Sequence, residues 1–403
     1  MANLFSKTAT QLARGVDRVF AGTALNPPKL LRGRSSAESL GHDDRMRALS
    51  LIGGFYNRES FVLRDGPFFV TPRPITPAVK HVRKLGRAGQ EGSGEVVDLS
   101  WASEFAPLWS SEALVAHFGS WAKRELEQAG IESGFTAEDI AALGVDRNGQ
   151  LPDKYRRAHA NLNGHARWWR HHGERRPTVV ILHGYMVGEY AIEERMWPVQ
   201  KLFDSGMDVV LSVLPFHGLR RSETRGLLPP AFPSGDPRFT IEGFRQLVFD
   251  HHALFDYLTY QGVPALGVMG VSLGGYGASL LATLEERLKL AVLFIPLSAI
   301  EEFAHTHGRF IGTAAQQDLQ REAMRKANWA VSPLARPPLI SGDKVVVISG
   351  DADAITGGRH AARLIEHFDA EPARFIGGHL LHFGRTQAFE SMWRLLRREG
   401  FAR

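Results

Sequence analysis

Apolar and polar positions follow a regular pattern from Glu95 onward. Short runs rich in Val, Ile and Leu are separated by segments whose apolar residues recur at helical spacing. The short runs predict strands at 95–101, 165–172, 178–184, 208–215, 265–271, 288–296, 344–350 and 373–378. The other segments predict helices at 111–130, 244–262, 276–286, 358–368 and 386–400. Apolar strands that alternate with amphipathic helices are typical of a mainly parallel sheet covered on both faces, so we expect an α/β fold.

Residues 1–94 lack this regular pattern and predict a helical N-terminal extension. Proline-rich breaks occur at LNPPKLL and TPRPITP, and the glycine-rich stretch LGRAGQEGSGE comes just before the first regular strand. We therefore place a domain boundary between residues 94 and 95, with one α/β domain over 95–403. The sequence leaves open whether the extension forms a lid, an interface or an anchor.

The first 20 residues predict an amphipathic helix. Its apolar positions are Phe5, Ala9, Leu12, Val16, Val19 and Phe20, with Lys7, Arg14 and Arg18 between them. Two interpretations remain open: the helix packs on the protein body, or it lies on an anionic membrane surface. We favour packing, because amphipathic helices mostly face a protein core.

The charge balance changes this picture little. The 403 residues carry a net charge of +5, which favours anionic partners such as a membrane surface. The basic residues are spread along the chain and form no recognisable nucleic-acid module, so we expect no nucleic-acid binding. No apolar run approaches the ~18 residues that a membrane span needs, and the N-terminus lacks the apolar core of a signal peptide. We expect a cytoplasmic protein, with peripheral contact to an anionic membrane left open and its oligomeric state unknown.

The residue types present also limit the chemistry. The chain has no cysteine, which excludes disulfides, thiolate metal sites and a cysteine nucleophile. Neither G-x-G-x-x-G nor G-x-x-x-x-G-K-[ST] occurs, so we expect no nucleotide cofactor and no other cofactor.

The stretch GVMGVSLGGYGASLLATL contains the pattern G-x-S-x-G at 270–274, centred on Ser272. An apolar strand runs into this pattern and a helix runs out of it, which is the context of a serine nucleophile on a sharp strand-to-helix turn. Small neighbours allow such a turn to close, and the following helix N-terminus offers N–H groups to an oxyanion. The alternative interpretation is a glycine-rich nucleotide-binding loop.

A serine nucleophile needs a base and an acid that orients the base. In a parallel sheet both should follow later strands. His379 directly follows the strand ARFIGG, and His382 is its rival three residues later. Asp351 and Asp353 both follow the strand KVVVISG. We favour His379, because it lies closest to the strand end.

The order Ser272, Asp353, His379 at successive strand ends resembles that of the α/β-hydrolases, and the resemblance covers residues 95–403. The pattern G-x-x-D at 350–353 resembles the acid loop of this superfamily and favours Asp353 over Asp351. The sequence His183-Gly184-Tyr185 resembles its HG-x motif. The resemblance implies an oxyanion hole formed by the backbone N–H groups of Tyr185 and Leu273.

The superfamily resemblance implies a serine hydrolase that cleaves a carboxylic ester through an acyl-enzyme, with an ester or an acyl lipid as its small-molecule substrate. A peptidase or acyltransferase with the same triad is one alternative. A binding protein that kept the fold without turnover is another. Because a fold does not define a substrate, these alternatives stay open.

The loop PFHGLRRS (215–222) is similar to a P-[aromatic]-[aromatic]-G-x-R-[KR]-P loop in a little-characterised branch of the α/β-hydrolase-domain proteins. Its Arg220 and Arg221 are candidates for binding a substrate phosphate or carboxylate. Pairing with surface acids is the equal alternative.

Two segments could cover the site, at 226–243 and at 299–331. The second lies where the α/β-hydrolase superfamily inserts its lid. It also contains the pair His305 and His307, for which no third metal ligand can be named. We therefore expect these two histidines to be solvent-exposed and predict no metal site.

Overall fold

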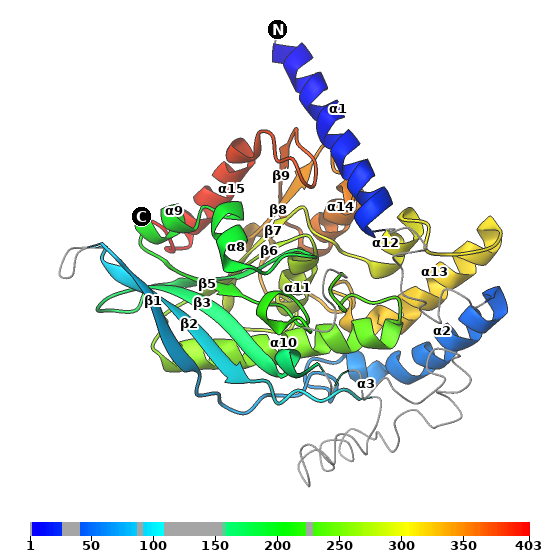
Figure 1. Ribbon diagram of the computed structural model, residues 1–403, viewed down its shortest axis with the longest axis horizontal. Coiled ribbons are helices and arrows are strands. Elements are labelled where there is room, and N and C mark those ends of the chain that lie inside the picture. Colours follow the sequence, from blue (N-terminus) through cyan, green and yellow to red (C-terminus); the bar gives the residue numbers. More distant parts are fainter. Residues whose placement is uncertain (1, 26–40, 87–91, 109–154, 156–157, 223–228) are drawn as a thin grey trace.

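The computed structural model describes residues 2–25, 41–86, 92–108, 155, 158–222 and 229–403. Nine strands form one sheet in the order β1-β2-β3-β5-β4-β6-β7-β8-β9 (Figure 1). The strands are β1 (Ala78–Leu85), β2 (Gly94–Ala102), β3 (Asn163–His171), β4 (Thr178–Leu182), β5 (Asp208–Ser212), β6 (Leu266–Val271), β7 (Leu288–Phe294), β8 (Val345–Gly350) and β9 (Glu371–Phe375). The pairs β1·β2, β2·β3 and β3·β5 are antiparallel. The remaining pairs, β5·β4, β4·β6, β6·β7, β7·β8 and β8·β9, are parallel.

Helices cover both faces of this sheet. The described helices are α1 (Ala2–Phe20), α2 (His42–Tyr56), α3 (Glu59–Val62), α8 (Tyr190–Met196), α9 (Val199–Asp204), α10 (Pro237–Tyr260), α11 (Leu273–Leu281), α12 (Ile300–Thr306), α13 (Ala314–Asn328), α14 (Gly357–Phe368) and α15 (Arg385–Arg398). Buried side chains of α2, α10, α11 and α14 form a core on one face, and those of α8, α9 and α15 form a core on the other.

Strand β4 shows why the sheet is buried on both sides. All five of its residues are buried. Val180 and Leu182 belong to one core, whereas Val179 and Ile181 belong to the other. Successive side chains of a strand point to opposite faces, so a strand that is apolar from Val179 to Leu182 needs apolar cover on each face.

The structure confirms the α/β fold and the eight strands predicted after residue 94, with ends that differ by a few residues. Four of the five predicted helices correspond to α10, α11, α14 and α15. The fifth, at 111–130, lies outside the described residues.

The predicted boundary at 94/95 needs a correction. Strand β1 lies within the supposed extension, yet it pairs antiparallel with β2, from Ala78 opposite Ser100 to Leu85 opposite Gly94. Residues 1–94 therefore contribute a strand to the main sheet rather than helices alone. We predicted no strand here because β1 is a basic edge strand, exposed or half-exposed along its whole length, and only its Val82 and Leu85 pack against the core.

Helix α1 packs on the body, as we favoured, but the face that packs only partly matches the predicted one. The buried positions Ala9, Ala13, Asp17 and Ala21 follow one another at four-residue spacing. Leu12, expected on the packed face, is exposed. In Figure 1 the C-terminal part of α1 lies beside α12, and its N-terminal turns project from the body.

Helices α12 and α13 occupy much of the segment 299–331 and lie between β7 and β8 in the chain. Helix α13 packs against α2. An inserted helical pair is thus present where a lid was expected, and its action as a lid stays a prediction.

Candidate active site

Ser272 lies on a sharp turn between β6 and α11. Its backbone has φ 55° and ψ −111°, a conformation that L-residues rarely adopt. A Cβ at Gly270 would lie 2.2 Å from the Gly274 carbonyl oxygen, and one at Gly274 would lie 2.2 Å from the Leu182 carbonyl oxygen. Both flanking glycines are therefore required by close backbone approach, and the turn presents Ser272 at the carboxyl end of β6.

His379 lies beside this serine. Its Nε2 is 2.9 Å from Ser272 Oγ, and its Nδ1 is 2.9 Å from Asp353 Oδ2. Because a carboxylate can only accept, Nδ1 carries the proton and Nε2 is left to accept from the serine hydroxyl. The side chains of His379 and Asp353 are 10% and 2% exposed, so little water competes for these bonds.

Asp353 is fixed by the loop that follows β8. Its Oδ1 accepts from the N–H groups of Ile355 at 2.8 Å and Thr356 at 3.0 Å. The Thr356 hydroxyl donates to Oδ2 at 2.7 Å. Burial alone would raise the pKa of this carboxyl group, but the charge and hydrogen bond of His379 and the donors of its own loop lower it well below the usual range. Asp353 is therefore ionised throughout the neutral range.

The neighbouring carboxylates raise the pKa of His379, whereas the neighbours of Asp353 lower its pKa. Burial would lower the pKa of the imidazole, but the charge and hydrogen bond of Asp353, with a contribution from the charge of Asp17, raise it above the ordinary value. The surroundings of His379 thus favour the charged form of its imidazole.

The alternative acid and the alternative base, Asp351 and His382, make their contacts elsewhere. Asp351 pairs with Arg374 at 2.7 Å near the surface. His382 has its Nε2 2.8 Å from the carbonyl oxygen of His379, and burial lowers its pKa to about 4. Only Asp353 and His379 of these four residues lie in the hydrogen-bonded series that reaches Ser272.

The segment after β4 passes close to the serine. A Cβ at Gly184 would lie 3.7 Å from Ser272 Cβ, and Tyr185 is the next residue. Leu273 is the first residue of α11, and the first N–H groups of a helix have no acceptor within it. This arrangement brings both expected oxyanion donors to the neighbourhood of Ser272, while their catalytic role stays a prediction.

The buried side chain of His183 links the segment after β4 to the segment after β5. The Leu214 N–H donates to its Nε2 at 3.0 Å, so Nδ1 carries the proton and donates to the Gly184 carbonyl oxygen at 2.7 Å. Burial lowers the pKa of His183 to about 4, which keeps the ring neutral in this role. Sequence reasoning assigned His183 only to a motif and missed this function.

Arg220 requires a correction. Its side chain is buried and pairs with the buried Asp250 at 2.7 Å, and it donates to the backbone oxygens of Asn161 and Val213. A guanidinium occupied in this way supports the loop 215–222 rather than receiving a substrate anion. Arg221 is half-buried and stays a candidate.

The two histidines of the 299–331 segment, His305 and His307, were both expected to be exposed, and only one of them is. His305 is exposed, but His307 is buried and its Nε2 is 2.9 Å from the carbonyl oxygen of Ile355, beside the acid loop. Across the described part of the chain, no group of three or more His, Cys, Asp or Glu side chains could hold a metal ion.

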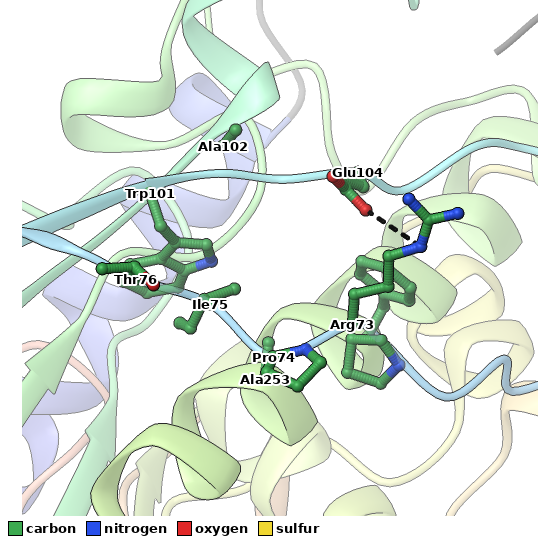
Figure 2. Close-up of a pocket in the computed structure, with 10 residues that line it drawn as sticks. Arg73, Pro74, Ile75, Thr76, Trp101, Ala102, Glu104 and Ala253 are labelled. Atoms are coloured by element: carbon green, nitrogen blue, oxygen red, sulfur yellow. Dashed lines mark ion pairs between the residues drawn. The ribbon is translucent and has the colours of Figure 1, made fainter. Parts of the chain in front are cut away.

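A separate pocket of about 180 Å³ lies against α10 and β2. Figure 2 shows Trp101 and Ile75 in this pocket and the ion pair of Arg73 with Glu104, whose atoms are 4.0 Å apart. The lining includes none of Ser272, Asp353 and His379, so the pocket is distinct from the candidate site.

Sequence reasoning missed Thr356 and Asp17, which also contact the site. Thr356 follows Asp353 by three residues, a spacing that suits a turn. Asp17 is buried and accepts from the His379 N–H at 2.6 Å. One signal was available: Asp17 is the only acidic residue in residues 1–37, and it shares the four-residue spacing of Ala9 and Ala13.

The strand order from β2 to β9 and the serine on the turn between β6 and α11 are those of the α/β-hydrolase fold, and this chain has that fold. No family model matches the sequence. It is 34% identical over 216 residues to two uncharacterized proteins, from two strains of Mycobacterium tuberculosis. The match covers 52% of this chain and 51% of each relative, so it spans about half of their length.

Similar solved structures include two esterases and a peptidase. An acetyl xylan esterase from Paenibacillus sp. R4 has a TM-score of 0.48 at 15% identity and covers 81% of this chain and 89% of its own. Acetyl xylan esterase 1 from Thermoanaerobacterium has a TM-score of 0.45 at 15% identity, over 81% and 95%. A puromycin-hydrolyzing peptidase of Mycobacterium tuberculosis has a TM-score of 0.44 at 17% identity, over 59% and 38%. At such values, the activity of this chain has to be argued from its own site.

Proposed function

We propose that this protein is a serine hydrolase that cleaves carboxylic esters. The observation that carries the proposal is the unbroken series from Ser272 Oγ through both nitrogens of His379 to Asp353, with 2.9 Å at each step. The strained backbone of the serine supports it, because such conformations persist where function requires them.

In the proposed mechanism, His379 Nε2 takes the hydroxyl proton as Ser272 Oγ attacks the ester carbonyl carbon. The carbonyl π electrons move to oxygen, and the backbone N–H groups of Tyr185 and Leu273 stabilise the oxyanion. The imidazolium then protonates the leaving alcohol as its C–O bond breaks. Water, deprotonated by His379, attacks the acyl-enzyme and releases the acid and free Ser272. Asp353 holds the tautomer of His379 and stabilises its charged form.

An acyl group with apolar character fits the surroundings of the site. Ile355, two residues after Asp353, packs with Tyr185 and Phe303 and with Phe20 and Ala21 at the end of the N-terminal helix. These side chains supply apolar contacts next to the proposed oxyanion donor. This favours an acyl ester or acyl lipid over a strongly charged substrate. A peptidase or acyltransferase would use the same triad, and a panel of esters, peptides and acyl acceptors separates the three.

The test is covalent labelling with a fluorophosphonate, which reacts with activated serines whatever their natural substrate. The wild-type chain is expected to be labelled at Ser272, as read by mass spectrometry, and Ser272→Ala is expected to remain unlabelled. A folded wild-type chain that does not react, even with small probes, would remove the proposal and favour a binding protein of the same fold.

Peripheral contact with an anionic membrane is a second proposal, supported by the unpacked face of α1. Leu12 and Val19 are 56% and 67% exposed, on a helix that also carries Lys7 and Arg18. No described helix has the length and apolar character to cross a bilayer. A helix lying on the surface would bury the two apolar side chains among acyl chains.

The double change Leu12→Asn and Val19→Asn is expected to reduce sedimentation with phosphatidylserine-containing vesicles. Leu63→Asn, which alters an equally exposed leucine elsewhere, serves as the matched control and is expected to leave sedimentation unchanged. Equal sedimentation of the wild type and the double variant would contradict membrane contact through α1.

A further inference from the structure

Helix α1 carries a buried carboxylate that contacts both loops of the triad. Asp17 Oδ2 accepts from the N–H of His379 at 2.6 Å and from the N–H of Ala354 at 3.2 Å. Its Oδ1 accepts from the N–H of Leu380 at 3.0 Å. The side chain is fully buried. A buried carboxylate is costly unless it is well hydrogen-bonded, and here three backbone donors meet that need.

The histidine loop, which is the loop after β9 that carries His379, leaves space for this carboxylate. A Cβ at Gly378 would lie 2.5 Å from Asp17 Oδ2 and 3.3 Å from Ala13 Cβ. Only glycine at 378 lets the backbone approach α1 so closely, and alanine at position 13 leaves room on the helix side.

Two further bonds tie α1 to the same region. The Arg14 guanidinium donates to the Asp351 carbonyl oxygen at 2.9 Å, and the Thr10 hydroxyl donates to the Ile376 carbonyl oxygen at 3.3 Å. The helix therefore spans the acid loop after β8 and the histidine loop after β9. Among these contacts, Asp17 alone bonds a residue of the triad.

We propose that Asp17 is the positioning residue of the active site, clamping the His379 loop to the acid loop so that Nε2 stays within reach of Ser272. This inference rests on the proposed hydrolase function. The backbone N–H and the imidazole belong to the same residue, so the position of the His379 backbone determines where the ring lies. Freeing that N–H lets the ring move relative to the serine, and a displacement of about 1 Å can cost on the order of 10²-fold in rate.

Asp17 also contributes negative charge near the imidazole. The titratable groups facing His379 are Asp353 on the acid loop, Asp17 on α1, His382 on its own loop and His307 after α12. Burial lowers the pKa of both neighbouring histidines and so disfavours their charged forms. The two carboxylates therefore supply the charge that favours the imidazolium.

The experiment replaces Asp17 with Asn in the full chain and measures the rate constant of fluorophosphonate labelling at Ser272 from pH 5 to 9. An amide keeps the size of the side chain. Either orientation, however, directs its NH₂ at a backbone N–H, because both oxygens of Asp17 accept. The labelling rate is expected to fall on the order of 10²-fold. Its acidic limb is expected to move to lower pH, since losing a negative charge lowers the pKa of His379.

Asp208→Asn is the matched control. Asp208 is an equally buried carboxylate that binds His171 at the opposite end of the sheet strands. Its replacement is expected to change the thermal unfolding midpoint without moving the pH profile. If the labelling rate fell only because the folded state was less stable, it would fall in both Asp17→Asn and Asp208→Asn.

Gly378→Ala tests the same contact from the other side, because its methyl group displaces Asp17 without changing any charge. It is expected to lower the labelling rate while leaving the acidic limb closer to that of the wild type than Asp17→Asn does. A wild-type chain labelled at Ser272, together with an Asp17→Asn variant of equal rate and equal pH profile, would overturn the inference. An unlabelled wild-type chain would instead overturn the proposed function, so the two failures are distinct.

Discussion

Replacing His379 with alanine is expected to lower kcat for ester hydrolysis by on the order of 10⁶-fold, the scale seen when a serine hydrolase loses its base. The Ser272 hydroxyl then loses the proposed proton acceptor, because Nε2 of His379 is the ring atom 2.9 Å from it. The measurement is steady-state hydrolysis of the best ester from a substrate panel, supported by the fluorophosphonate labelling rate.

His382→Ala is the informative comparison for this prediction. His382 contacts the His379 carbonyl oxygen rather than the serine, so its loss is expected to cost far less activity. Equal losses in the two variants would contradict the assignment of His379 as the base and would return His382 to consideration.

Replacing Asp353 with asparagine is expected to lower kcat by about 10⁴-fold, because an amide can hold the imidazole in the wrong tautomer. The pH profile should change as well. Asp353 is the largest source of the raised pKa of His379, against the lowering effect of burial. Without the carboxylate, burial dominates, the pKa of His379 falls, and the acidic limb of the residual activity moves to lower pH.

Asp351→Asn controls for a general change of charge near this loop. Asp351 pairs with Arg374 and lies outside the hydrogen-bonded series, so the variant is expected to keep most of its activity. A limb that moved to higher pH in Asp353→Asn would contradict the electrostatic account of His379.

The parts of the structure that were predictable carry strong local signals. The apolar runs that form β4, β6, β7 and β8 are long enough to identify buried strands without knowing their neighbours. Likewise, the G-x-S-x-G pattern needs only its own flanking strand and helix to be recognised. Ser272 and Asp353 each follow such a strand, and His379 follows the less buried strand β9, so the place of each in the fold could be expected from the sequence.

The parts that were missed depend on contacts between distant segments. Arg220 was a candidate for binding a substrate anion because nothing near it in sequence reveals Asp250 as its partner. The edge strand β1 is mostly polar and has no fully buried residue, and its pairing with β2 is visible only in the folded sheet. On α1, apolar spacing pointed to Leu12, whereas the buried positions are three alanines, at 9, 13 and 21 just after the helix, and one acid, Asp17.

The bond between Asp17 and His379 joins residues 362 positions apart. At a synthesis rate of about 5–20 residues per second, roughly 20–70 s separate the emergence of these two residues from the ribosome. Ser272 emerges in between, before His379 is synthesised. On the proposed mechanism, a nascent chain therefore carries this serine without a base, and ester cleavage begins only after translation has passed residue 379 and the loop of His379 has met helix α1.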